Sequence, residues 1–128
     1  MANLAGSRTR HILLVAALVA CATPRRGSLE KSVIRDVVRS HRAEVSACYE
    51  HEALENPSLG GRLKIKFIIS ASGDVSEIEV VSSELQSPAL ERCVIELVRT
   101  WVFPRPKGDG EVPVTYPLSF GQAIEVEQ

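Results

Sequence analysis

The sequence predicts an α+β fold in the order α-β-β-α-β, with two helices packed on one face of a three-stranded antiparallel sheet. Two kinds of periodicity carry this prediction. Apolar residues recur at every second position in residues 62–69 and 112–120, and Ile78 and Val80 alternate with Glu77 and Glu79 within residues 75–83, which is typical of strands with one buried face. They recur at helical spacing in residues 29–49 and 88–101. Each helix has to bury its apolar stripe, and the apolar face of the sheet is the surface available to it.

The first helix is expected as one continuous element. Ser28 is a suitable N-cap, and Glu30 would place a negative charge in the first turn. Asn56 and Pro57 would end the helix. Its apolar stripe consists of Leu29, Val33, Ile34, Val37, Val38, His41, Val45, Cys48 and Tyr49.

The two middle strands form a predicted hairpin. Strands 62–69 and 75–83 both place apolar residues at inward positions. Gly73 lies in the turn between them. The outward positions are basic on the first strand and acidic on the second, so they can pair across the hairpin. The inward residues are Leu63, Ile65, Phe67, Ile69, Ile78 and Val80, and the outward charged residues are Arg62, Lys64, Lys66, Glu77 and Glu79.

The second helix and the third strand follow from proline positions as much as from periodicity. Ser87 and Pro88 fit the N-cap and first helical positions, and Pro104 and Pro106 would end a helix that runs through Leu90, Val94, Leu97, Val98 and Trp101. Pro113 and Pro117 share a parity within the third strand, so their missing N–H groups face one side. The other side can still pair fully, which predicts an edge strand.

Composition favours a single globular domain. The chain has 128 residues, of which 45% are hydrophobic and 24% charged, with a net charge of −1 and a pI near 6.3. A chain with this charge balance does not show the excess of basic residues that is typical of nucleic-acid-binding proteins.

The amino terminus is expected to be an export signal. Residues 1–20 contain basic residues, then an apolar run that is too short for a bilayer-spanning helix. The ending Leu18-Val19-Ala20-Cys21 looks like a bacterial lipobox, in which Cys21 would be lipidated, and Ala22 favours the outer membrane. The alternative is an ordinary signal peptide cleaved nearby. We expect a lipidated cysteine and linker at 21–28, a domain at 29–121 and a tail at 122–128.

Lipidation of Cys21 would leave Cys48 and Cys93 as a pair. Both lie at or near the inner stripes of the two helices, and an exported chain favours oxidation. We therefore expect a Cys48–Cys93 disulfide. The alternative is two small buried residues that never bond.

His41, Glu44 and Cys48 are the candidates for chemistry, because they could lie on adjacent helical turns. Their spacing is not that of a zinc motif, and the cysteine has a better use in a disulfide. The sequence also contains no phosphate-binding glycine loop and no nucleophile-elbow motif. We expect no enzyme, cofactor or metal site, with a small metallo- or thiol enzyme using His41 and Cys48 as the alternative.

A family resemblance rests on motifs that occur in a fixed order. They are Gly61-Arg62-Leu63-Lys64-Ile65-Lys66-Phe67, Gly73-Asp74-Val75, Val81-Ser82-Ser83, Leu90-Glu91-Arg92-Cys93, Trp101-Val102-Phe103-Pro104 and Val114-Thr115-Tyr116-Pro117-Leu118-Ser119-Phe120. Together they resemble the TonB carboxy-terminal domain over residues 29–121. Cys48-Tyr49-Glu50 and Glu91-Arg92-Cys93 are similar to its AgmX/PglI variant, named after gliding-motility proteins of myxobacteria.

The resemblance implies the α-β-β-α-β fold and a role in protein binding. TonB couples the proton motive force of the inner membrane to outer-membrane receptors and captures a receptor strand on its sheet edge. Its inner-membrane helix and long proline-rich linker are not seen in this sequence, so we do not expect a complete energy transducer. Pro113 and Pro117 weaken strand capture without excluding it, because the carbonyls and the Thr115 N–H remain.

We therefore expect a lipid-anchored periplasmic module that binds an envelope protein. Binding would use the edge residues Val112, Val114, Thr115, Tyr116 and Leu118 or the outer-face residues Arg62, Lys64 and Lys66. A purely structural envelope lipoprotein is the alternative. The exposed edge also permits a homodimer by strand pairing.

Overall fold

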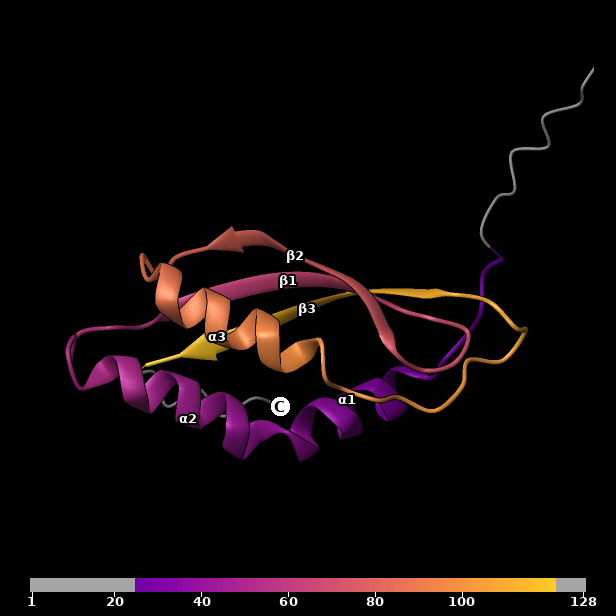
Figure 1. Cartoon of the computed structure of the whole chain (residues 1–128), viewed down its shortest axis with the longest axis horizontal. Coiled ribbons are helices and arrows are strands. Elements are labelled where there is room, and N and C mark those ends of the chain that lie inside the picture. The colour runs from indigo at the N-terminus through magenta and orange to yellow at the C-terminus, as the bar shows by residue number, and fades with distance from the viewer. Residues whose placement is uncertain (1–24, 122–128) are drawn as a thin grey trace, which may run out of the picture.

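The central strand of the sheet is β1, in a computed structural model that describes residues 25–121. In chain order the elements are α1 (Lys31–Ser40), α2 (Arg42–Ala53), β1 (Gly61–Ile69), β2 (Val75–Ser83), α3 (Pro88–Val98) and β3 (Val112–Phe120). Both neighbours of β1 run antiparallel to it, in the order β2-β1-β3. The helices lie on one side of the sheet (Figure 1). The predicted α+β fold and the edge position of the third strand are confirmed.

The core lies between the inward face of β1 and the helices. Leu63, Ile65, Phe67 and Ile69 are each at most 1% exposed, as the alternation predicted. The helices contribute Ile34, Val38, Val45, Cys48, Leu90, Val94 and Val98 to the same cluster. The opposite face of the sheet is therefore left to solvent.

The first helix is broken at His41, so the prediction of one continuous helix was wrong. His41 has φ −99° and ψ 9° and separates α1 from α2. Two contacts favour the break. The Ser40 hydroxyl donates to the Val37 carbonyl at 2.6 Å, and the His41 ring stacks on Trp101 with 4.9 Å between ring centroids. The predicted stripe is otherwise correct, because α1 and α2 both bury residues from it.

The predicted cap at Ser28 was also wrong. α1 begins at Lys31, with Glu30 at the N-cap and no side-chain capping bond. Ser28 belongs instead to an extended segment, Arg25–Ser28, which we call the strap. The strap pairs with the loop before β3, so part of the predicted linker is bonded into the domain.

α3 begins as predicted, because the Ser87 hydroxyl accepts a hydrogen bond from the Leu90 N–H at 3.2 Å and Pro88 follows it. It ends at Val98, earlier than the expected stop at Pro104. The Thr100 hydroxyl donates to the Leu97 carbonyl at 2.7 Å, and Val102 pairs with Asp74 beyond it. Trp101 lies after the helix but is 1% exposed, so its inward position was predicted correctly.

A Cys48–Cys93 disulfide joins α2 to α3, with 5.9 Å between the Cα atoms, which confirms the predicted pairing. The two cysteines are 45 positions apart, and closing a loop of that length contributes about 4 kcal/mol in the chain-entropy account. The helix layer is thus tied together covalently on the inner side of the sheet.

The predicted signal, Cys21 and the tail 122–128 lie outside the described residues. Within residues 25–121, every helix is too short or too polar to cross a bilayer.

Candidate functional site

The free edge of β3 is the first candidate site, and the strap shows which backbone groups face it. The Glu111 N–H donates to the Arg25 carbonyl at 2.7 Å, and the Gly27 N–H donates to the Glu111 carbonyl at 2.8 Å. Backbone groups of alternate residues in a strand point to the same side, so residues 113, 115, 117 and 119 also face this edge. The two proline nitrogens therefore point away from β1.

This placement explains why the β1–β3 ladder is complete. All nine residues of β3 pair with β1 without a register shift, with Pro117 opposite Lys64 and Pro113 opposite Ile68. Beyond Glu111, no other strand of residues 25–121 pairs with the outer side of β3. That side retains the N–H groups of Thr115 and Ser119 and the carbonyls of all four outward-facing residues. It is an acceptor-rich edge.

The predicted edge residues divide by face. Thr115 is exposed on the outer side of the sheet. Val112, Val114, Tyr116 and Leu118 turn toward the helices, where Val114 is 9% exposed and the others are half-buried against the core. A captured strand would therefore contact only the small exposed part of each of these four side chains.

The free edge of β2 is the second candidate site. The Glu84 N–H donates to the Arg62 carbonyl at 2.9 Å, so alternate residues from Arg62 on face β2. Lys66 is one of these residues, and it pairs with Glu79, so the backbone groups of Glu79 face β1. The backbone groups of its neighbours Ile78 and Val80 therefore face the free edge.

Two bulges shorten the β2 edge. The register shifts between Lys64 and Ile65 and again between Ile68 and Ile69, which leaves Val81 and Ser76 as extra residues. Regular pairing between the bulges covers only Glu77–Val80.

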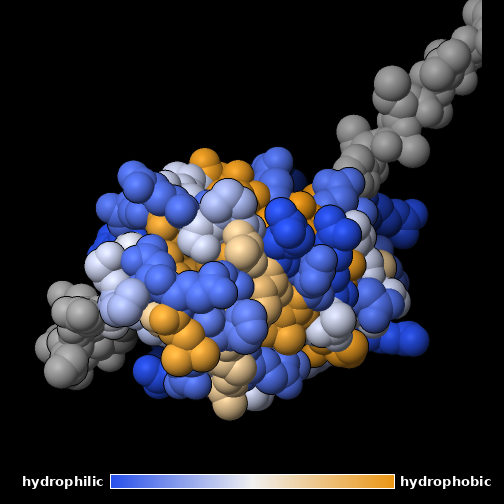
Figure 2. All heavy atoms as spheres, turned by 60° about the vertical axis from the view of Figure 1, so that its left-hand side comes forward, coloured by the Kyte–Doolittle hydropathy of each residue, from blue (hydrophilic) through white to orange (hydrophobic). Residues whose placement is uncertain are grey.

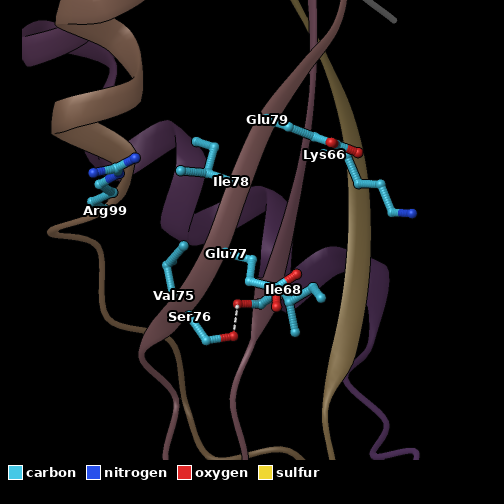
Figure 3. A pocket seen from close by; sticks show the side chains of 8 residues that line it. All are labelled: Lys66, Ile68, Val75, Ser76, Glu77, Ile78, Glu79 and Arg99. Atoms are coloured by element: carbon cyan, nitrogen blue, oxygen red, sulfur yellow. Dashed lines mark hydrogen bonds between the residues drawn. The ribbon is translucent and has the colours of Figure 1, made fainter.

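A surface hollow of about 610 Å³ lies along this edge and is lined by residues of β1 and β2 and by Arg99. Arg99, Val75 and Ile78 lie on the helix side of β2 in Figure 3, and Glu77, Glu79 and Lys66 lie on the other side. Its lining carries both signs of charge. The hollow therefore favours neither an acidic nor a basic ligand.

The outer face of the sheet is the third candidate site. Arg62, Lys64 and Lys66 are exposed there, as predicted. The register places Lys66 opposite Glu79, yet no Lys or Arg within residues 25–121 has a carboxylate oxygen within 4 Å of a side-chain nitrogen. The charges of the hairpin are neighbours without forming ion pairs. On the β3 side, these cations meet only uncharged residues.

The alternative catalytic residues are occupied by structural contacts. Cys48 has no thiol, because its sulfur is bonded to Cys93. His41 Nδ1 lies 3.1 Å from Glu44 Oε2, and its ring packs on Trp101. In the described part of the chain no three His, Cys, Asp or Glu side chains are grouped so that they could hold a metal ion. The disulfide contradicts the thiol-enzyme alternative.

The end of the molecule opposite the strap is shown in Figure 2, where apolar side chains form patches separated by polar ones. Leu54, at the end of α2, is 82% exposed, and Val81 at the β2 bulge is 51% exposed.

Sequence reasoning missed the strap. Its only signal was the absence of side-chain bulk at Gly27 and Gly110, and a single sequence does not show that these two glycines meet.

The geometry defines a class: a small α+β domain whose open sheet presents two free edges and one solvent-exposed face. The model of the family "Gram-negative bacterial TonB protein C-terminal" matches residues 49–121, which is more than half of the chain. The chain belongs to this TonB carboxy-terminal domain family. The match begins after α1, so it covers α2 only in part.

A solved structure of the family shares the fold. The TonB carboxy-terminal domain of Helicobacter pylori is 21% identical with a TM-score of 0.50, and the alignment covers 73% of this chain and 96% of that one. The TonB carboxy-terminal domain of Pseudomonas aeruginosa is 20% identical with a TM-score of 0.46, over 80% of this chain and 88% of that one. No curated protein sequence matches this chain.

Proposed function

We propose that this chain is a non-enzymatic, lipid-anchored module of the bacterial cell envelope that binds an extended segment of a partner protein on the free edge of β3. The observation that carries the proposal is the acceptor-rich edge around Thr115, with two N–H groups and four carbonyls on one side of a fully paired strand. Adding a strand to such an edge gives affinity through main-chain hydrogen bonds. Energy transduction is not part of this proposal.

The outer face specifies the chemistry of the partner. A strand added to β3 would turn every second side chain toward the face that carries Arg62, Lys64 and Lys66. The outward side chains of β3 between them, such as Thr115, are short and uncharged. Acidic side chains on the partner could therefore reach across to Lys64 and Lys66. The β2 acids lie on the far side of these cations. We propose a partner segment with acidic residues at alternate positions.

The anchor would be Cys21, on the evidence of the lipobox-like sequence that it ends. A diacylated and N-acylated cysteine carries more than one chain, which stable anchoring requires. The disulfide between Cys48 and Cys93 supports export to an oxidising compartment. We propose a periplasmic location, with the anchor in the outer membrane, and membership of the AgmX/PglI type within the family.

The binding proposal is tested with two synthetic peptides and amide chemical shifts. In the acidic strand peptide valine alternates with glutamate, and in the matched basic strand peptide valine alternates with lysine. The acidic peptide should shift the amides of Thr115 and Ser119 and leave those of Ile78 and Val80 unchanged. The basic peptide should bind at least several-fold more weakly. Shifts confined to β2, or equal binding of both peptides, would contradict the proposal.

A charge variant provides the matched control for that experiment. Replacing Lys64 and Lys66 by glutamine removes exposed charges and leaves the backbone edge intact. The variant should lose the preference for the acidic peptide but keep its folded spectrum.

Intact mass spectrometry of the membrane-extracted chain tests the anchor. The expected mass shows cleavage before Cys21, added acyl chains and a gain of two protons on reduction. An uncleaved or unacylated chain would refute the anchor, and a chain whose mass does not change on reduction would refute the disulfide.

A further inference from the structure

The strap fixes where the chain leaves the domain toward its amino terminus. It is bonded at two points, because the Ser28 N–H donates to the Lys107 carbonyl and the Lys107 N–H donates back, each at 2.9 Å, in addition to the two bonds with Glu111. Arg26 thereby forms a single parallel rung beside Glu111. The next rung of a parallel ladder would need an N–H at Pro113, which has none. The strap is thus a short, terminated extension of the β3 edge.

Close backbone contact holds the strap in place. A Cβ atom built on Gly110 would overlap the carbonyl oxygen of Arg25, and one built on Gly27 would overlap the carbonyl oxygen of Gly110. Any larger residue at either position would push the two segments apart. The docked strap therefore depends on both glycines.

The strap lies at one end of the sheet, which we call the strap end. The loop of residues 104–110 bonds to the strap, and the β1–β2 turn meets the same region because the Phe103 N–H donates to the Gly73 carbonyl at 2.9 Å. In Figure 1 these segments gather at the right, whereas the end of α2 and the start of β1 lie at the left. We call the latter the far end. A nine-residue strand is about 30 Å long, so the two ends are well separated.

We propose that the strap end rests on the membrane that carries the lipid anchor, so that the sheet stands with its far end pointing away from the bilayer. This inference rests on the proposed lipidation of Cys21. Four residue steps join Cys21 to Arg25, and a fully extended chain covers at most about 14 Å in that distance. With the strap docked, the lipid cannot reach the far end.

The two ends differ in charge in the direction that this orientation requires. The strap end exposes the basic residues Arg25, Arg26, Lys31, Arg105 and Lys107 against the exposed acids Glu30, Asp74 and Asp109, with Glu111 half-buried. It also exposes Val102, at 64%, beside Pro104. Such a mixture suits the headgroup region of a bilayer that contains anionic lipid.

The far end is acidic. Glu50, Glu55 and Glu84 are exposed there and Glu52 is half-buried, whereas the exposed basic residues on the start of β1 and the first half of α3 are Arg62 and Arg92. An anionic headgroup layer would repel this end. A tether raises the local concentration of the strap end at the bilayer, so a weak preference between the ends is enough to orient the domain.

Lipid-dependent quenching of a fluorophore measures which end meets the membrane. The full chain, acylated in cells, is reconstituted in vesicles of phosphatidylethanolamine and phosphatidylglycerol that contain a headgroup quencher. Lys107→Cys places the fluorophore at the strap end, and Glu55→Cys places it at the far end, with the Cys48–Cys93 disulfide left oxidised. We expect several-fold stronger quenching at position 107 than at position 55. Equal quenching, or stronger quenching at position 55, would overturn the proposal.

Two tether variants separate orientation from folding. Gly110→Val should release the strap and bring the two quenching signals close together. Because that variant also risks misfolding, a flexible Gly-Ser insertion between Pro24 and Arg25 serves as the second test and should have the same effect with the strap docked. The same insertion after Gly121 should change neither signal. Unchanged quenching after the Pro24–Arg25 insertion would show that the tether does not set the orientation.

The mass of the same preparation distinguishes the two proposals. A chain without acyl groups on Cys21 would refute the proposed anchor and the membrane contact with it. An acylated chain whose far end is quenched would refute only the orientation.

Discussion

The two free edges of the sheet are protected from pairing in different ways. β2 has bulges at Ser76 and Val81, which displace the backbone and interrupt its donors and acceptors alike. β3 has Pro113 and Pro117, which remove donors but leave its pairing with β1 in register and every carbonyl in place. Uncontrolled edge pairing leads to aggregation, and both devices reduce it. Only the second leaves a continuous edge that a suitable partner can still use.

The largest expected effect comes from removing the disulfide between α2 and α3. Replacing Cys48 and Cys93 by alanine should lower the free energy of unfolding by about 4 kcal/mol, because a loop of 45 positions is no longer closed. Both edge strands pair with β1, but α3 contacts β2 as well, so amide exchange should accelerate more in α3 and β2 than in β3. Denaturant titration and residue-resolved hydrogen exchange measure the two quantities. Equal acceleration in both edges would show that the edges are not independently supported.

Restoring the missing donors should have the next largest effect. Pro113→Val combined with Pro117→Val adds two N–H groups to the β3 edge, which should strengthen binding of the acidic strand peptide about thirtyfold at about 1 kcal/mol per hydrogen bond. The variant should also dimerise, as sedimentation velocity would show. Thr115→Val, which changes no backbone donor, is the matched control. A monomeric double variant with unchanged affinity would contradict the role assigned to the prolines.

Removing a remaining donor should have a smaller effect in the opposite direction. Thr115→Pro leaves only Ser119 to donate within the free β3 edge, so affinity for the acidic strand peptide should fall about fivefold. Val80→Pro removes a free-edge donor from β2 and should leave the affinity unchanged. A titration of each folded variant measures the difference. If Val80→Pro reduces the affinity more than Thr115→Pro does, the two edges have been assigned in reverse.

The smallest expected effect tests how β2 influences the face beside β3. Glu79 lies opposite Lys66 in the β1–β2 register without forming an ion pair with it. Glu79→Gln should strengthen binding of the acidic strand peptide about twofold, within the range of exposed charge interactions. Raising the salt concentration should remove the gain. A gain that persists in high salt would point to a cause other than charge.

The sequence predicted the sheet well because alternation and proline parity are local signals. The buried positions of β1, the edge position of β3 and the direction of its prolines all follow from residues within each strand. The Ser87 cap and the cysteine pairing were also predictable from residue type and helical position.

The features that sequence missed depend on contacts between distant segments. The break at His41 involves stacking on Trp101, and the end of α3 involves pairing of Val102 with Asp74. The β2 bulges and the strap likewise become visible only when two strands or segments are placed side by side. Ser28 had the right residue type for a helix cap, but its backbone pairs with Lys107 instead.

Photo-crosslinking in the intact envelope would test most directly whether the partner is bound on β3 rather than on β2. A photoreactive residue replaces Thr115 on the β3 edge or Val81 on the β2 edge, both of which are exposed. The account predicts a protein adduct from position 115 whose yield falls when Lys64→Gln and Lys66→Gln are added on β1, and no adduct from position 81. An adduct from position 81 alone would contradict it.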